Sequence, residues 1–502
     1  MNLALTNGII PESWKEAEII MIYKEGTNSD EVQNYRPISL LNNDYKIFTK
    51  ILANQFKTFL ADWVSEEQTG FLPNRSVRDN IRTIIDTIEY YEVNQQKVLG
   101  LLSLDAEKAF DKLNWDFFKV LIQELDVGWQ FQNGIKAIYN EQGAKIRING
   151  QTTENFPINK GTRQGCPLSP LIFIFALELL IRNIKKDKNL KGMRIDKQEY
   201  KVRAFADDII CIIENPKHNI QIWLDKIEEF GKLAGLKINK NKTKILTKNM
   251  TNSSKDELRE ESGLDTPLKI KYLGIWISAK NNQLLELNYI TKWKEIRRDL
   301  DAWKNLNLSL LGRVATIKMT ILPKILYLFQ NIPIIRNNNL FKVWQWDISR
   351  FIWNNKKPRI KHSTMITPKN KGGVGLPDLR MYHEACAMDW LKEWTNLQKI
   401  KILTLEGHDL RRGWHGYLWY NKVSVEKNFR NHFIRSSLIK VWEKYKNYLY
   451  TKTSLWLSPL EANQRRLLGW IEWPTYKDIL KKESLIQKSP QIKDLIEIQK
   501  NL

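Results

Sequence analysis

Cysteine is nearly absent from this chain, with three residues in 502, Cys166, Cys211 and Cys386, far apart in the sequence. This spacing argues against a disulfide framework, a zinc knuckle and secretion, and it suits a reducing compartment. The first residues lack the basic start and apolar run of a signal peptide. The apolar run 171–177 is too short to span a bilayer and is followed by Glu178. We therefore expect no membrane partner and a location in the nucleus and cytoplasm.

Acidic residues are scarce relative to basic ones. The chain has 56 Asp and Glu against 79 Lys and Arg, which gives a formal net charge of +23. Such a charge favours a polyanionic partner, because Lys and Arg gain affinity by releasing counterions from phosphates. The alternative is a solubilising surface. With 42% hydrophobic residues, a chain of this length can bury a large core and divide into several subdomains.

Two adjacent carboxylates lie between two apolar runs. Residues 201–204 and 209–213 flank Phe205–Asp208, and this pattern predicts a hairpin with Asp207 and Asp208 at its turn. Two charges held together are costly unless a cation neutralises them, and hard cations such as Mg²⁺ favour carboxylate oxygens. An exposed turn with solvated aspartates is the alternative.

A third carboxylate ends another apolar run. Residues 98–104 are predicted to form a buried strand that ends at Asp105. Strands that deliver acids to one edge of a sheet can build a two-metal site for phosphoryl transfer. For Asp105 alone, a helix N-cap is the alternative.

A glycine-rich polar loop, 160–170, lies between these acids and precedes an apolar helix at 171–178. Such a loop lets the backbone approach a nucleotide or a base pair closely. An ordinary loop before a core helix is equally compatible with the pattern.

Taken in order, these segments resemble the reverse transcriptase of LINE-type (non-LTR) retrotransposons. The core of the resemblance is Ser103–Asp111, Gly161–Pro170 and Phe205–Asp208. Further segments match in the same order, and the last of them resembles the C-terminal region of the vertebrate LINE group: Asn34–Leu41, Glu67–Phe71, Gly235–Asn239 with Lys242–Thr243, Lys271–Ile275 and Gly372–Leu379. The resemblance covers most of the chain.

The resemblance implies an α+β right-hand polymerase fold followed by a mostly helical, Trp-rich C-terminal region. We expect fingers at 1–97, a palm with an antiparallel sheet and the catalytic site at 98–287, a helical thumb with a linker at 288–400, and the C-terminal region at 401–502. The pattern also predicts helices at 44–60 and 80–92 and a polar loop at 250–255.

Tryptophan is concentrated towards the end of the chain, with 13 of 19 residues from position 288 onward. We expect most of them in a helix-bundle core. The alternative is a thumb whose aromatic rings stack on bases. The segment Lys356–Lys361 is predicted to contact phosphates.

By resemblance, the chain is an RNA-directed DNA polymerase that adds dNTPs to a primer 3′-hydroxyl. Asp105, Asp207 and Asp208 are then the catalytic metal ligands, holding two Mg²⁺ ions or Mn²⁺ in their place, with Asp208 contributing less directly. Lys242 would protonate or neutralise the leaving pyrophosphate; a solvated lysine is the alternative.

The substrate contacts implied by the resemblance fall on three segments. Phe110 matches a steric gate that rejects the ribose 2′-hydroxyl, although a core Phe at a helix start is the alternative. Gln164 and Gly165 would lie along the templating pair. Three arginines are candidates for gripping the triphosphate, namely Arg36, Arg75 and Arg78.

The implied partners are an RNA template, a DNA primer or target DNA, and dNTPs, with a retrotransposon RNA-binding protein as a further candidate. Relatives carry an N-terminal endonuclease, and many carry a C-terminal Cys/His knuckle. Neither is found in this sequence, so we expect the chain not to nick its own target. A catalytically silent, nucleic-acid-binding remnant is one alternative. An RNA-templated RNA polymerase is another, and Phe110 counts against it.

Overall fold

The computed structural model describes residues 1–125, 127–396, 399–410, 414–419, 422–430 and 432–453. The chain forms two compact units, the first made of residues 1–80 and 95–273 and the second of residues 81–94 and those from 274 onward. The predicted division into fingers, palm, thumb and C-terminal region is not tested by this division and stays a prediction. Its last part, from 454 to 502, lies outside the described residues.

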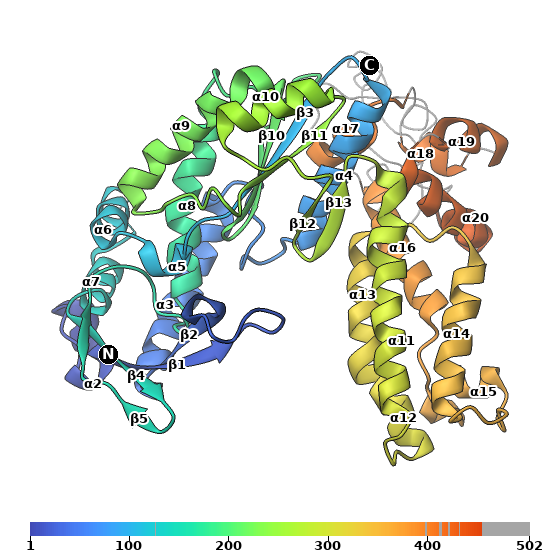
Figure 1. The fold of residues 1–502 in the computed structure, drawn as a ribbon, viewed down its shortest axis with the longest axis horizontal. Helices are drawn as coiled ribbons and strands as arrows, with labels where there is room; N and C mark the ends of the chain where they lie inside the picture. Colours follow the sequence, from blue (N-terminus) through green and yellow to red (C-terminus); the bar gives the residue numbers. More distant parts are fainter. Residues whose placement is uncertain (126, 397–398, 411–413, 420–421, 431, 454–502) are drawn as a thin grey trace, which may run out of the picture. The chain divides into compact units, whose positions relative to one another are not determined.

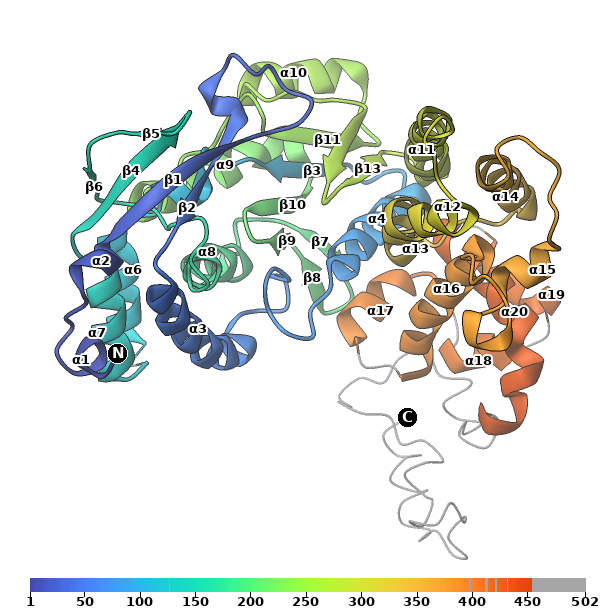
Figure 2. The ribbon, with the colours of Figure 1, turned by 90° about the horizontal axis from the view of Figure 1, so that it is seen from below.

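A four-stranded antiparallel sheet forms the centre of the first unit (Figures 1 and 2). Its order is β11-β3-β10-β9, and its strands are β3 (Leu99–Leu104), β9 (Val202–Phe205), β10 (Asp208–Glu214) and β11 (Lys244–Lys248). Leu104 pairs with Ile209, so the end of β3 and the start of β10 lie at the same edge. The predicted strand and hairpin are therefore confirmed.

Two long helices, α8 (Ser169–Lys186) and α9 (Pro216–Ala234), cover one face of this sheet. In α9 the apolar residues recur at helical spacing, including Ile220, Trp223 and Ile227, and this stripe is buried against the sheet. Helix α8 is apolar over most of its length because other elements surround it, and 12 of its 18 residues are buried. The two helices thus support the central sheet on this face.

The first unit contains a second sheet, in which β1 pairs with β2 antiparallel and with β4 parallel. The predicted helix 44–60 is confirmed as α3. The remaining elements of the first unit are α1 (Asn2–Thr6), α2 (Glu12–Lys15), β1 (Glu16–Tyr23), β2 (Tyr35–Leu40), α3 (Asn43–Trp63), α5 (Ala109–Lys112), α6 (Trp115–Glu124), α7 (Trp129–Ile138), β4 (Gln142–Ile148), β5 (Gln151–Thr152), β6 (Phe156–Ile158), β7 (Met193–Ile195), β8 (Gln198–Tyr200), α10 (Asn252–Ser262) and β12 (Lys269–Tyr272).

The predicted polar loop at 250–255 is wrong, because α10 begins at Asn252. Thr251 is its N-cap, and the hydroxyl oxygen of Thr251 accepts a hydrogen bond from the Ser254 backbone N–H at 3.3 Å. Ser, Thr and Asn are common both in loops and at helix starts, so composition alone did not separate the two. The buried side chain of Leu258 then anchors the helix.

The second unit is mainly helical. Its elements are β13 (Ile275–Ser278), α11 (Thr291–Trp303), α12 (Leu310–Thr316), α13 (Leu322–Asn331), α14 (Asn338–Ile352), α15 (His362–Ile366), α16 (Leu379–Asn396), α17 (Ile400–Glu406), α18 (Trp414–Trp419), α19 (Lys422–Phe429) and α20 (Phe433–Thr453). Helix α4 (Val77–Val93), which confirms the helix predicted at 80–92, belongs to this unit from Ile81 onward. Its buried Arg82 forms ion pairs with Glu393 and Glu406.

Five of the described tryptophans of the second unit are buried in its core, which bears out part of the prediction: Trp293, Trp344, Trp390, Trp394 and Trp442. Trp344 is fully buried and stacks on Trp293 with ring centroids 4.7 Å apart, and Trp390 and Trp394 are also buried. Trp346 differs, since it is 58% exposed. The predicted α+β class, with an antiparallel acid-bearing sheet and a helical second part, is confirmed. In the part of the chain that is described, no helix combines the length and apolarity needed to cross a membrane.

Candidate active site

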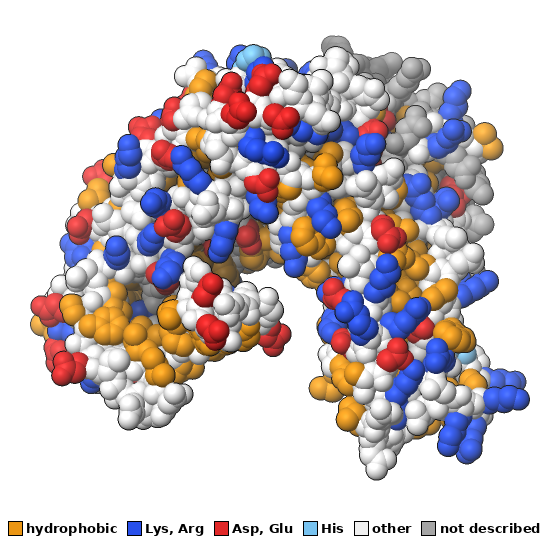
Figure 3. All heavy atoms as spheres, in the orientation of Figure 1, with side chains coloured by type: hydrophobic (Ala, Val, Ile, Leu, Met, Phe, Trp, Pro, Cys, Tyr) orange, Lys and Arg blue, Asp and Glu red, His pale blue; other side chains and the backbone are white. Residues whose placement is uncertain are grey.

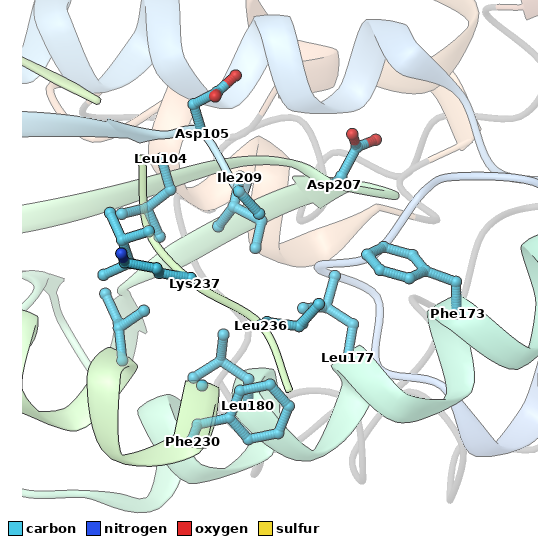
Figure 4. A pocket seen from close by; sticks show the side chains of 14 residues that line it. Leu104, Asp105, Phe173, Leu177, Leu180, Asp207, Ile209, Phe230, Leu236 and Lys237 are labelled. Atoms are coloured by element: carbon cyan, nitrogen blue, oxygen red, sulfur yellow. The ribbon is translucent and has the colours of Figure 1, made fainter. Parts of the chain in front are cut away.

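The structure brings the three predicted carboxylates to one edge of the central sheet. Asp105 follows β3 directly, and Asp207 and Asp208 lie at the turn between β9 and β10, where Phe205 pairs with Asp208. Figure 4 shows the carboxylates of Asp105 and Asp207 directed to the same side, away from the apolar side chains beneath them. These acids come from segments about a hundred residues apart in the sequence.

Burial and mutual repulsion raise the pKa of the hairpin acids. Burial is the main cause of the raised pKa of Asp207, and the charge of Asp105 adds to it. The pKa of Asp208 rises to about 6, first through burial and then through the charges of Asp207 and Asp105. The charge of Asp105 therefore disfavours the ionisation of both hairpin acids, and a cation beside them would relieve this cost.

The oxygen donor set fits Mg²⁺, which prefers carboxylates and keeps several waters or phosphate oxygens as further ligands. Within the described ranges, no three His, Cys, Asp or Glu side chains already converge on a single cation position.

Asp105 is fixed by a neighbouring segment of backbone. Its carbonyl oxygen accepts a hydrogen bond from the Asn239 N–H at 2.8 Å, and its own N–H donates to the Thr243 hydroxyl at 3.2 Å. The alternative of a helix N-cap at Asp105 is wrong, since α5 begins at Ala109. Lys242 lies in this bracing segment with an exposed side chain. The predicted role of Lys242 in protonating or neutralising the pyrophosphate stays a prediction.

An apolar cavity of about 40 Å³ lies beneath the acids (Figure 4). Its lining includes Leu104, Phe173, Leu177, Ile209 and Phe230. Burial against this apolar floor is the first cause of the raised pKa of Asp207.

Phe110 lies in the short helix α5, on the chain segment that follows Asp105. Its ring is half-buried and stacks on Phe173 with centroids 4.4 Å apart. This contact fixes the orientation of the ring while leaving part of it accessible. The predicted steric gate and the alternative of a core residue both fit this position, so the gate stays a prediction.

The glycine-rich loop packs between α5 and β2. The Gln164 carbonyl accepts a hydrogen bond from the Ser39 N–H at 2.7 Å, and the Gln164 side chain donates to Asp111. Gly165 has φ +129°, and a Cβ there would lie 2.5 Å from the Ser39 carbonyl oxygen. A side chain at Gly165 is therefore excluded both by the positive φ and by the packing against Ser39. The predicted approach to the templating pair stays a prediction.

The three candidate arginines occupy different environments. Arg36 is exposed on β2, and Arg78 is half-buried in the first turn of α4. Arg75 donates hydrogen bonds to four backbone carbonyls at the end of α3 and just beyond it, those of Ala61, Val64, Ser65 and Gln68. These bonds favour a structural role for Arg75.

One residue beside the acids had no assigned role in the sequence. Gln68, fully buried, contacts the backbone of the turn that carries Asp207. In the sequence analysis, Gln68 is only one residue of the segment Glu67–Phe71 that supports the family resemblance. A polar residue in such a segment is more often exposed, and nothing local distinguishes a buried one.

Comparison with known proteins identifies the family. The pattern of the family described as "Reverse transcriptase (RNA-dependent DNA polymerase)" matches residues 22–277, just over half of the chain. The chain belongs to the reverse transcriptase family. All three acids, Phe110 and the glycine-rich loop fall within the matched region, so the candidate site lies in the reverse transcriptase domain.

The relatives of this reverse transcriptase include transposon proteins. It is 27% identical to the Transposon TX1 uncharacterized 149 kDa protein of Xenopus laevis, over 75% of this chain and 28% of that protein. It is 24% identical to the RNA-directed DNA polymerase from mobile element jockey of Drosophila melanogaster, over 68% of this chain and 38% of that protein. The chain thus spans only a minor part of the length of these relatives.

Among solved structures, it is similar to telomerase from Candida tropicalis in complex with a fragment of telomeric RNA. The identity is 16% and the TM-score 0.41, over 79% of this chain and 65% of that one.

Proposed function

We propose that the chain adds dNTPs to a primer 3′-hydroxyl on an RNA template, as the polymerising part of a retrotransposon protein. The observation that supports this most is the gathering of Asp105, Asp207 and Asp208 at one sheet edge, where their charges repel one another. Two Mg²⁺ ions held by these acids would activate the hydroxyl and stabilise the leaving pyrophosphate.

The residues around the acids would position and select the nucleotide. Phe110, held by its stacking on Phe173, would exclude a sugar that carries a 2′-hydroxyl. Gln164 and Gly165, which pack against Ser39 of β2, would lie along the templating pair. Lys242, on the segment that braces Asp105, would neutralise or protonate the pyrophosphate. Arg36 and Arg78 remain candidates for contacting the triphosphate.

A basic segment of the second unit is proposed to contact the nucleic-acid backbone. Lys356, Lys357, Arg359 and Lys361 are all exposed, and Lys and Arg side chains gather around the adjacent α15 (Figure 3). On α14, which precedes the segment, the guanidinium of Arg350 lies over the exposed ring of Trp346, 4.6 Å from its centroid. Cations beside an exposed aromatic ring suit a partner with phosphates and bases.

Primer extension tests this proposal. The purified chain is assayed on a poly(rA)/oligo(dT) hybrid with dTTP and Mg²⁺, with Asp207→Asn as the inactive control. We expect extension that requires Mg²⁺ and is abolished in the variant. No extension together with tight, salt-sensitive binding of the hybrid would contradict catalysis by this chain and support a silent nucleic-acid-binding protein instead.

A further inference from the structure

The turn that carries Asp207 has a strained backbone. Ala206 has φ +52°, in the left-handed region that residues with a Cβ disfavour. It is the first of the two residues that link β9 to β10, and Asp207 is the second. A positive φ at the first position is the pattern of a type II′ turn, where glycine is the usual residue. Something outside the turn must therefore hold this conformation.

The side chain of Gln68 binds both polar groups of Ala206. Its Oε1 accepts hydrogen bonds from the Ala206 N–H at 2.9 Å and from the Gly70 N–H at 2.8 Å, and its Nε2 lies 3.5 Å from the Ala206 carbonyl. The orientation of the amide follows from chemistry, since only its oxygen can accept from two N–H groups. With no solvent access, these backbone groups have no water to replace the side chain.

The segment that carries Gln68 is itself fixed to β9. The Ala204 N–H donates to the Glu67 carbonyl, and the Thr69 N–H donates to the Ala204 carbonyl, both at 2.9 Å. The side chain of Asn80 adds a hydrogen bond to the same Ala204 carbonyl. This pairing makes residues 67–69 a short extension at the edge of the sheet. The position of Gln68 is therefore fixed by the hydrogen bonds that its two neighbours, Glu67 and Thr69, make with Ala204.

The backbone of Gly70 packs directly against the turn. A Cβ at Gly70 would lie 2.6 Å from the Ala206 nitrogen, so the two backbones are in direct contact. The peptide between Ala206 and Asp207 sets the direction in which the Asp207 side chain leaves the turn. Because Gln68 binds the carbonyl of that peptide, rotation of the peptide would break a buried hydrogen bond.

From these contacts we infer that Gln68 is a positioning residue for Asp207. It stabilises the left-handed Ala206 and keeps the Asp207 carboxylate on the side of the turn where Asp105 lies. Because its side chain is fully buried, it would act through Asp207 and not on the substrate directly. The inference rests on the proposed metal-dependent polymerisation, in which Asp207 and Asp105 share the ions.

The test compares Gln68→Met, which keeps the length of the side chain but cannot hydrogen-bond, with the parent. Removing a group that orients a metal ligand reduces metal affinity or activity by roughly 10- to 100-fold. We expect kcat to fall in this range and the Mg²⁺ concentration for half-maximal rate to rise. The affinity for the primer–template hybrid should change less than about twofold, because no nucleic-acid contact is lost. Gln221→Met, on the exposed face of α9, is the matched control and should leave all three quantities unchanged.

A second variant separates positioning from simple loss of structure. Adding Ala206→Gly to Gln68→Met removes the strain, because glycine adopts a positive φ freely. Partial recovery of kcat and of Mg²⁺ dependence in the double variant is expected. An unchanged kcat in Gln68→Met, or a loss of hybrid binding in proportion to kcat with unaltered Mg²⁺ dependence, would overturn the inference.

A measurement of Mn²⁺ binding tests the positioning role of Gln68 separately from the proposed polymerase activity. Binding is measured by electron paramagnetic resonance on the parent and Gln68→Met, each with hybrid and dTTP on a dideoxy-terminated primer. If the parent binds Mn²⁺ but extends no primer, the proposed function fails, and weaker binding by Gln68→Met still supports the positioning role. Equal binding by both proteins overturns it.

Discussion

The side-chain amide of Gln164 donates a hydrogen bond of 3.1 Å to the carboxylate of Asp111, which ties the glycine-rich loop to α5. Phe110 lies next to Asp111, and its carbonyl accepts a hydrogen bond from the Thr162 N–H at 2.6 Å, so more than one bond links the two segments proposed to face the nucleotide. Burial raises the pKa of Asp111, while the bond from Gln164 opposes that rise.

Asp111→Ala should therefore loosen the loop, because it leaves the Gln164 amide without its acceptor. We expect the KM for dTTP to rise by about tenfold, the cost of roughly one buried hydrogen bond, with little change in hybrid affinity. Steady-state single-nucleotide incorporation measures both. Asp111→Asn is the control, since its side-chain oxygen still accepts from Gln164. If both variants behave alike, the charge rather than the bond matters.

Phe110→Ala should relax sugar selection. Removal of the ring opens space beneath the sugar, and we expect the preference for dTTP over UTP, as a ratio of kcat/KM values, to fall roughly 10- to 200-fold. Competition between the two nucleotides at a single template position measures the ratio. Phe59→Ala, at a partly exposed position on α3, is the control. An unchanged ratio would instead support the reading of Phe110 as a core residue.

Replacing the four cations of the basic segment by Gln should weaken hybrid binding mainly at low salt. Each phosphate contact contributes about 0.7 to 0.9 to the slope of log affinity against log salt concentration, so the slope should fall by up to about 3 for Lys356, Lys357, Arg359 and Lys361 together. Fluorescence anisotropy across a salt series measures it. Four exposed lysines of the first unit form the matched control, namely Lys186, Lys188, Lys191 and Lys197. An equal loss of slope in both sets would indicate a general effect of net charge.

His383 should make the second unit sensitive to acid. Its Nε2 accepts a hydrogen bond from the Ile335 N–H at 3.3 Å, which requires a neutral ring, and burial lowers its pKa from 6.5 to about 4. The unfolded chain takes up the proton first as the pH falls, so the stabilisation is present above pH 6.5 and is lost towards pH 4. The loss amounts to about 3 kcal/mol.

Urea unfolding followed at a series of pH values measures this dependence. His383→Gln should flatten it, because the Gln oxygen can accept from Ile335 and does not titrate over this range. His362→Gln, at an exposed position, should leave the dependence intact. The same pH dependence in His383→Gln and the parent would show that other groups cause it.

The amino-acid sequence by itself determined the elements that carry the acids. Apolar runs that end at Asp105 and flank Asp207 are local patterns, and each predicted strand or helix depends on residues within a few positions of one another. For the same reason α3, α4 and α8 were predictable. The order of the motifs then indicated the family, which the match over residues 22–277 bears out.

Only the tertiary structure decided which polar side chains support the site. Gln68 acts on Ala206 across 138 positions of sequence, and Gln164 reaches Asp111 across 53. Arg75 was one of three candidates for the triphosphate, and only the structure shows that its guanidinium donates to backbone carbonyls. A polar side chain takes its role from the partner that folding brings to it. A buried polar group needs a hydrogen-bond partner, because water cannot reach it. The residues next to it in the sequence do not specify which group that partner will be.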